Sequence, residues 1–373
     1  SSALASAFGS RLSFSSCLSA QLRFSSRSCS NRSSSCSRLA WSASAFCWRS
    51  LACATLALGM ASAWSAGSAA STASTHWPTQ TVRLVVGFPA GSSPDLTARA
   101  LAEPLSKALG QNVIVENIGG ASGVIGTAAL TRADADGYTF AVVFDTHGVN
   151  PSLKDKLPYD TIKDIAPVIL IGTSPMVLVA SKNSGITSFK QLTEMSKAGK
   201  PFSYGSIGIG SLGHLSMARL AKQAGFDWNH IPYRGGGPLM QDALGGQVQL
   251  AVGSEFLVKP HVDSGGVIPL VITTAKRTAA LPNVPTVSES GFPGFNAPAW
   301  WAVLAPGKTP PAIVNAMNQA VTKALKTPAV ASKLKAQGIE IVAGNPETLR
   351  DFIGKQIAVW GKFVIENNIK ETQ

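Results

Sequence analysis

The chain has 373 residues, enough for two domains, and a formal net charge of +12. Residues 1–75 contain six Arg but no Lys and no acidic residue, so the rest of the chain carries 26 basic and 20 acidic residues, a net charge of +6. That part has no run of Lys and Arg interleaved with aromatic residues, which argues against nucleic-acid binding.

The N-terminal part predicts an exported protein. Residues 1–47 are rich in Ser with scattered Arg and no periodic apolar face, so we expect a disordered or non-native extension there. From Trp48 to Ala63, one positive charge precedes a short apolar run that ends in Ala-Ser-Ala, which is the layout of a secretory signal peptide. We therefore expect a signal peptide and a short linker over residues 48–75. The apolar run is too short for a membrane anchor, which needs about 20 apolar residues. The alternative to a signal peptide is a short hydrophobic helix.

The cysteines support export. The expected mature chain contains none, which excludes disulfides, cysteine nucleophiles and thiolate metal sites, and suits an oxidising compartment such as a periplasm. All five precede the expected cleavage site: Cys17, Cys29, Cys36, Cys47 and Cys53.

The first strand and helix of the mature chain predict a small-anion site. The apolar strand Val82–Gly87 runs through a Pro/Gly/Ser turn into a helix over 94–109, in which we expect Ser93 as N-cap and Asp95 in the first turn. A helix start leaves backbone N–H groups unpaired, with a partial positive charge behind them. An ordinary βα turn remains the alternative.

Strand and helix patterns then alternate along the chain, which predicts an α/β fold whose sheets are of parallel type and flanked by helices. A return crossing into the first domain is expected over 297–305, followed by a C-terminal helical part with an apolar face. The expected strands are 113–116, 138–144, 177–180, 202–205, 248–252 and 267–273, and the expected helices are 124–132, 189–197, 211–224 and 238–244.

A second glycine turn lies between strand 202–205 and helix 211–224. Residues 208–213 match the pattern G-x-G-x-x-G, but the next acid, Asp227, is not at the spacing of a dinucleotide site. A second small-anion turn that faces the first across a cleft fits better. His214 lies one turn into this helix, where it is either near the cleft mouth or a capped structural residue.

The chain shows little catalytic machinery. No G-x-S-x-G elbow is present, the histidines lack metal-ligand spacing, and the acids are scattered over separate elements. We therefore expect a binding protein without catalytic residues, metal or cofactor. The alternative is an enzyme such as a hydrolase or isomerase on the same scaffold.

Taken in order, the motifs resemble those of the Bug-type receptors, the periplasmic solute-binding components of tripartite tricarboxylate transporters. The likeness covers about residues 77–370, and each motif alone is weak. The motifs are Phe88–Gly91 with Asp95, Glu116-Asn117 with Gly123, 136–139, 150–160, 205–211 with His214-Leu215, 232–235, 244–248, 281–286 and 289–291.

The resemblance implies a two-lobed clamshell hinged on two strand crossovers. The expected first lobe is 76–175 plus 300–373, and the second is 176–299. It also implies a monomeric, non-enzymatic receptor that holds a small carboxylate through backbone groups and water and delivers it to membrane subunits, or else an orphan receptor that serves a sensor protein. The implied ligand-binding residues are Phe88, Ala90, Gly91, Ser92, Asp95 and Thr146 in lobe one, and Ser206, Gly208, Ser211, His214 and Gly235 in lobe two.

Three positions depart from the family pattern. Ser92 replaces a second glycine, which adds a hydroxyl group and restricts the backbone. Arg219 stands where many members carry an acid, and we expect it on a solvated face. Arg234 is often Lys in relatives, and its side chain could either reach the mouth of the cleft or lie on the surface.

Overall fold

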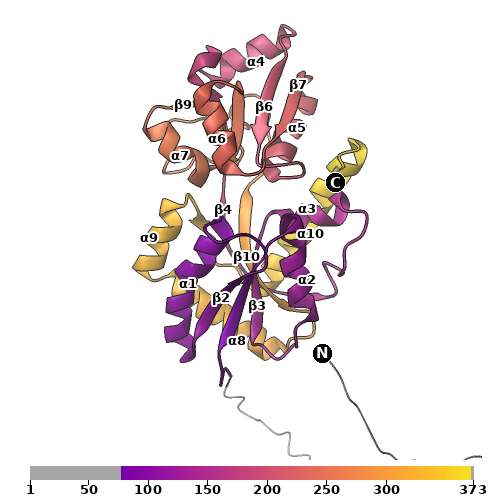
Figure 1. Cartoon of the computed structure of the whole chain (residues 1–373), viewed down its shortest axis with the longest axis vertical. Coiled ribbons are helices and arrows are strands. Elements are labelled where there is room, and N and C mark those ends of the chain that lie inside the picture. Colours follow the sequence, from indigo (N-terminus) through magenta and orange to yellow (C-terminus); the bar gives the residue numbers. More distant parts are fainter. Residues whose placement is uncertain (1–76, 371–373) are drawn as a thin grey trace, which may run out of the picture. The chain divides into compact units, whose positions relative to one another are not determined.

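The computed structural model describes residues 77–370. The extension expected over 1–47 and the signal peptide expected over 48–75 lie outside the described residues. Two sheets organise the described part, and we call the elements around each sheet a lobe (Figure 1).

Lobe one is built on a six-stranded sheet with the strand order β11-β4-β10-β3-β1-β2. Its strands are β1 (Val82–Val86), β2 (Val113–Asn117), β3 (Thr139–Phe144), β4 (Ile165–Ser174), β10 (Ala299–Pro306) and β11 (Glu340–Ile341). Its helices are α1 (Ser93–Leu109), η1 (Ala121–Gly123), α2 (Val124–Arg132), α3 (Thr146–Leu153), α8 (Pro311–Leu325), α9 (Pro328–Ala336) and α10 (Pro346–Glu366).

Helices cover both faces of this sheet because its central strands are apolar on both sides. Leu84 and Val86 of β1 join the cluster formed with α1 and α8, whereas Val85 between them faces α2 and α10. The apolar face expected in the C-terminal part packs as core: Leu349 and Ile353 of α10 lie against the second face of the sheet.

Lobe two is built on a five-stranded sheet with the order β7-β6-β8-β5-β9. Its strands are β5 (Met176–Ser181), β6 (Phe202–Ser206), β7 (Trp228–Pro232), β8 (Leu250–Ser254) and β9 (Val267–Ile272). Its helices are η2 (Lys182–Ser184), α4 (Phe189–Lys197), α5 (Leu212–Ala224), α6 (Gly236–Gly245) and α7 (Glu255–Asp263).

The predicted two-lobed α/β fold is confirmed, but the sheets are mixed rather than parallel in type. β1 pairs in parallel with β2 and β3, and β6 does so with β7 and β8. β10 runs antiparallel to β3 and β4, and β5 runs antiparallel to β8 and β9. The antiparallel strands adjoin the two crossovers, where the chain leaves one sheet and later returns, so their direction follows from the connection and not from a βα repeat.

One buried side chain ties the two crossovers together. Pro175 joins β4 to β5, and residues 295–298 lead back into β10. The hydroxyl group of Thr273 donates to the carbonyl of Ala297 at 2.7 Å and accepts the N–H of Met176 at 3.0 Å. Thr273 is fully buried. The two connections are therefore fixed to each other at the point where the lobes meet.

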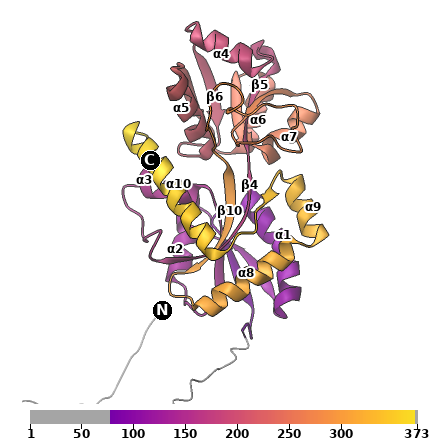
Figure 2. The same ribbon diagram turned by 180° about the vertical axis from the view of Figure 1, so that it is seen from behind.

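Helix α10 packs on lobe one and also reaches lobe two, where it lies beside α5 (Figures 1 and 2). Arg219 of α5 lies between two aromatic rings, with its guanidinium carbon 5.3 Å from the centre of Phe295 and 5.9 Å from that of Trp360 on α10. The expectation of a solvated face for Arg219 is therefore wrong, because the side chain is half-buried and bridges the lobes.

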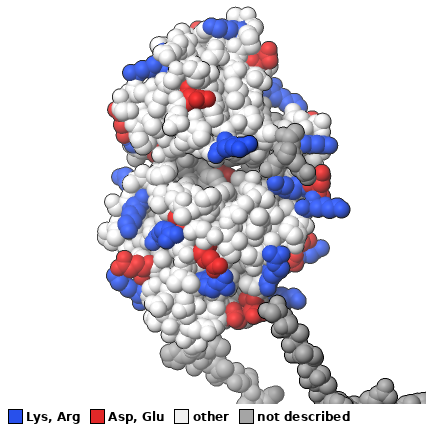
Figure 3. Space-filling view, viewed as in Figure 1, with Lys and Arg blue, Asp and Glu red and all other residues white. Residues whose placement is uncertain are grey.

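Charged side chains of both signs are interspersed over the face in Figure 3, without a broad basic area. A furrow crosses this face at the level where the lobes meet. Among residues 77–370, no helix is long and apolar enough to span a membrane.

Candidate functional site

The loop between β1 and α1 is closed by a buried carboxylate. Asp95 is 1% exposed and accepts hydrogen bonds from the N–H of Gly91 at 2.8 Å, from Asn117 Nδ2 at 2.8 Å and from Arg99 Nε at 2.9 Å. The amide of Asn117 also donates to the carbonyl of Phe88 at 3.0 Å. Both ends of the loop are thus fixed to one carboxylate–amide pair.

These contacts also set the charge of Asp95. Burial alone would raise the pKa of this carboxyl group, but the hydrogen bonds from Arg99 and from its two other donors outweigh burial and hold the pKa below its ordinary value. Asp95 was expected to line the site, and the structure places it behind the loop. Its oxygens are used within the chain, so it shapes the loop.

Helix α1 begins one residue earlier than expected, with Ser92 and not Ser93 as its N-cap. The turn is made by Gly91, whose φ of +80° favours glycine. Ser92 itself has an extended backbone (φ −69°, ψ 158°), so serine fits this position without strain. Its hydroxyl group caps no amide of the helix.

The hydroxyl groups of Ser92 and Ser93 are enclosed, and within residues 77–370 neither has a hydrogen-bond partner. Buried hydroxyl groups are normally paired, so an unpaired one at a helix start marks a place where a ligand or water completes the hydrogen bonding. Phe88 and Ser92 are half-buried, whereas Ala90 and Gly91 are exposed.

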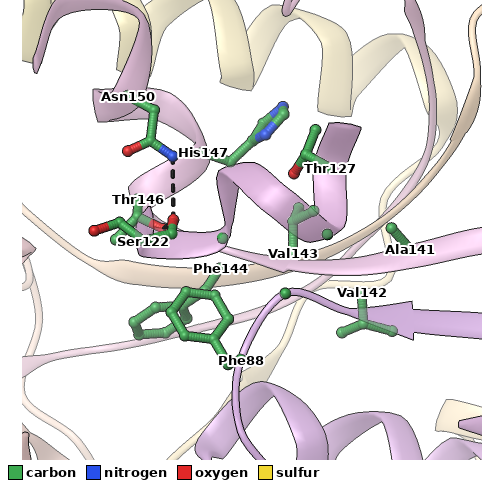
Figure 4. Close-up of a pocket in the computed structure, with 13 residues that line it drawn as sticks. Phe88, Ser122, Thr127, Ala141, Val142, Val143, Phe144, Thr146, His147 and Asn150 are labelled. Atoms are coloured by element: carbon green, nitrogen blue, oxygen red, sulfur yellow. Dashed lines mark hydrogen bonds between the residues drawn. The ribbon is translucent and has the colours of Figure 1, made fainter. Parts of the chain in front are cut away.

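A glycine-rich turn and helix α3 form the neighbouring wall (Figure 4). Thr146 donates its hydroxyl proton to the carbonyl of Ser122 at 2.9 Å, and Asn150 Nδ2 donates to the same oxygen at 3.1 Å. Thr146, one of the implied ligand-binding residues, is the first residue of α3. These residues and Phe88 border a cavity of about 10 Å³, room for about one water molecule.

Two buried titratable groups lie at the start of α3. Burial raises the pKa of Asp145 well above its ordinary value, and the N–H of Thr146 lowers it to a smaller extent. Burial lowers the pKa of His147 to about 4, so the ring is neutral at pH 7. Neither ring nitrogen of His147 has a partner in the described part of the chain. Of these two groups, the neutral His147 lines the cavity.

The second turn, residues 206–211 of lobe two, is held by its own serines. Ser211 caps α5 by accepting the N–H of His214 at 3.3 Å and donates to the carbonyl of Gly208 at 2.7 Å. Ser206 is fully buried at the end of β6, and its Oγ lies 3.2 Å from that of Ser211. The structure therefore brings Ser206, Gly208, Ser211 and His214 into one cluster.

Gly235 belongs to the next turn of the same lobe. It precedes α6 with a φ of +126°, a conformation that favours glycine. The turn lies beside the cluster because the N–H of Tyr233 donates to the carbonyl of Ser206 at 2.8 Å.

The two lobes touch at this cluster. A side chain on Gly210 would collide with Leu153 at the end of α3, so glycine lets the second turn approach lobe one. On another part of the seam, a Cβ on Gly338 would lie 2.7 Å from a carboxylate oxygen of Glu255. Both the turn 206–211 and α3 therefore border the junction between the lobes.

Sequence reasoning did not predict that His230 supports the turn 206–211 or that Asn117 supports the loop between β1 and α1. His230 contacts Ser206 because β6 and β7 pair in parallel and place Tyr204 opposite His230, a register that no local pattern reveals. Asn117 ends β2 beside β1, and its place at the carboxyl end of a predicted strand was an available signal.

Two mixed sheets joined by two crossovers, with a glycine–serine turn at a helix start in each, form the two-lobed fold of the periplasmic binding proteins, and solved structures agree. "R. palustris Rpa4515 with adipate" matches with a TM-score of 0.71 and 34% identity over 79% of this chain and 99% of that one. MatC from Rhodopseudomonas palustris with bound malate matches with a TM-score of 0.68 and 30% identity over 77% and 99%.

Family comparisons are more specific. The model of the tripartite tricarboxylate transporter family receptor matches residues 97–369. Protein BugT of Bordetella pertussis (strain Tohama I) is 36% identical over 309 residues, which are 82% of this chain and 94% of BugT. The chain therefore belongs to the tripartite tricarboxylate transporter receptor family, and the resemblance to Bug-type receptors is confirmed.

Proposed function

We propose that this chain is a periplasmic receptor that binds a small organic acid between its lobes and delivers it to the membrane subunits of a transporter. The observation that carries the proposal is the start of α1, where two enclosed hydroxyl groups have no partner in the described chain. Relatives of the same family have been solved with adipate and with malate, which supports a carboxylate as the ligand.

The donors that this site supplies are neutral. Arg83 and Arg99 are the cations that flank the loop in sequence. The guanidinium group of Arg83 is bound to Glu116, and that of Arg99 is bound to Asp95 and Asn117. A ligand carboxylate would instead meet backbone N–H groups and hydroxyl groups at a helix start, where the helix dipole favours an anion. The binding residues of this proposal are ten of the eleven implied by the resemblance, and the eleventh, Asp95, shapes the loop behind them.

Binding to both lobes would also explain closure. A ligand that contacts the α1 start and the turn 206–211 at once has higher affinity for the closed arrangement and shifts the population towards it. Export through the expected signal peptide and transfer to membrane subunits complete the proposal.

A thermal-shift screen tests the binding step. Mono-, di- and tricarboxylates are each compared with the uncharged compound of the same chain length in which every carboxylate is replaced by an amide. At 100 times its Kd, a ligand stabilises the protein by about 2.7 kcal/mol. An unfolding entropy of about 2.1 cal/mol/K per residue then gives a rise in Tm of roughly 4–5 °C for a folded part of this size. A shift with an acid and none with its amide supports the proposal, whereas no shift with any acid at millimolar concentration contradicts it.

The hydroxyl group of Ser92 provides a second test. Ser92→Ala should weaken binding of the acid about tenfold, because it removes one hydrogen bond to a charged group. Ser92→Gly should do the same without changing the rest of the loop. Unchanged Kd values by calorimetry would remove Ser92 from the site.

A further inference from the structure

Two histidines of lobe two are stacked face to face. The ring centres of His214 on α5 and His230 on β7 are 3.8 Å apart, and the rings are inclined by 10°. His214 is 8% exposed, and the ring of Tyr204 also lies near His230, with a ring-centre distance of 5.1 Å. The pair lies directly beside the turn 206–211.

Hydrogen bonds fix which nitrogen of His214 carries the proton. The N–H of Gly210 donates to Nδ1 at 3.1 Å, so Nδ1 is an acceptor and the neutral ring has its proton on Nε2. Within residues 77–370, Nε2 has no hydrogen-bond partner, and it is not among the fully enclosed atoms. His214 therefore keeps one free N–H donor.

The serine hydroxyl groups are not free in the same way. The Oγ of Ser206 lies 2.7 Å from His230 Nε2 and 3.0 Å from the carbonyl of Gly208, and Ser211 lies 2.7 Å from that same carbonyl. Each hydroxyl group has one proton, and either tautomer of His230 leaves both protons used inside the turn. Among the side chains of Ser206, Ser211 and His214, the donor that remains for a ligand is therefore Nε2 of His214.

We propose that His230 is a positioning residue: stacked on His214, it keeps that imidazole neutral with its proton on Nε2, so that His214 meets an anion as a neutral side-chain donor. The inference rests on the ligand site proposed above. It adds that acidification does not turn this site into a cationic one.

The environment of the pair agrees with this. Burial lowers the pKa of His214 to about 4, and burial together with the charge of His214 lowers that of His230 to about 3. Tyr204 is the titratable group in contact with the pair, through its ring and a 3.3 Å bond to the carbonyl of His214, and burial raises its pKa. Among residues 77–370, no other titratable side chain forms a hydrogen bond, ion pair or ring contact with either imidazole. Protonation of Nδ1 would also deprive the N–H of Gly210 of its acceptor.

The test reads the ring nitrogens of the ligand-free protein by ¹⁵N NMR between pH 8 and pH 4, and calorimetry follows an acid that binds. We expect His214 Nδ1 to stay unprotonated down to pH 5 and the Kd to change less than twofold from pH 8 to pH 5.5. Titration of His214 near pH 6.5, or binding that tightens on acidification, overturns the inference.

Two variants separate the stack from the hydrogen bond. His230→Phe loses the contact with Ser206 but keeps an aromatic ring against His214. Because the stack is retained, the ligand Kd should still change less than twofold between pH 8 and pH 5.5. His230→Ala opens one face of His214 to water, so His214 should titrate near pH 6.5 and binding should tighten at least threefold from pH 7.5 to pH 5.5. An unchanged His214 titration in His230→Ala contradicts the inference.

The outcomes also separate the inference from the function. If no acid binds, the proposed function fails, while the NMR titrations of wild type, His230→Phe and His230→Ala still decide the role of the stack. If an acid binds and His214 titrates near pH 6.5, the inference fails alone.

Discussion

Removing the carboxylate of Asp95 should loosen the β1–α1 loop and weaken ligand binding. In Asp95→Ala the N–H of Gly91 and the amide of Asn117 lose a charged acceptor. Each hydrogen bond to a charged group contributes about 1.5–3 kcal/mol. The guanidinium group of Arg99 is half exposed and becomes hydrated when the carboxylate is removed, so the loss of its ion pair adds nothing to the expected loss of stability. The expected loss is about 3 kcal/mol of unfolding free energy, a large share of the 5–15 kcal/mol typical of a domain.

The same helix provides a matched control. Glu103 and Lys107 form an ion pair with the same spacing as Asp95 and Arg99, but both side chains are about three-quarters exposed. Glu103→Ala should leave unfolding by urea and ligand affinity unchanged within error. Asp95→Ala should lower the urea midpoint and weaken binding at least tenfold. Equal effects of the two substitutions would refute the reasoning, because they would show that burial of the carboxylate does not matter.

Three further predictions concern the scaffold. His147 is neutral in the fold with a pKa of about 4, whereas an unfolded histidine has a pKa near 6.5. The stabilisation that comes from burying the neutral ring is therefore complete above pH 6.5 and is lost as the pH falls towards 4. His147→Phe should reduce the acid-induced loss of stability by about 3 kcal/mol in urea titrations. Gly126→Ala places a Cβ 2.6 Å from the backbone at the end of β1 and should cost about 1–3 kcal/mol, whereas Gly354→Ala, with nothing within 4 Å, should stabilise α10 by about 0.5–1 kcal/mol. Arg219→Ala should weaken the contact between α5 and α10 by about 1 kcal/mol and raise the ligand-free radius of gyration in X-ray scattering. Adding Trp360→Leu to Arg219→Ala should raise the radius of gyration little further, because the two side chains form one contact. A second increase of equal size would contradict the contact between Arg219 and Trp360.

Local patterns predicted the elements whose ends carry strong signals. The strand that ends at Gly87 and the helix that ends at Gly110 are in place, because a buried apolar run and a left-handed glycine cap act over a few residues. Helix α3 was not predicted, since Asn150 and Pro151 lie inside it and its residues pack against α10 rather than follow a strong helical pattern. Here tertiary contacts override local preference.

The site divides in the same way. The two turns were predicted from their glycines and serines, and Ser206 and Ser211 do share one hydrogen-bonded cluster. Burial was not predictable from spacing, so the sequence could not show that Asp95 lies behind its loop or that Arg219 bridges the lobes. The partner of His214 lies on a neighbouring strand, which depends on sheet register.

A crystal structure of the protein with a bound acid from the screen tests the central claim most directly. The account predicts closed lobes, with one carboxylate within hydrogen-bonding distance of the Ser92 hydroxyl group and the first backbone N–H groups of α1, and with the turn 206–211 on its other side. A carboxylate held by an Arg or Lys side chain, or bound away from the junction of the lobes, would contradict it.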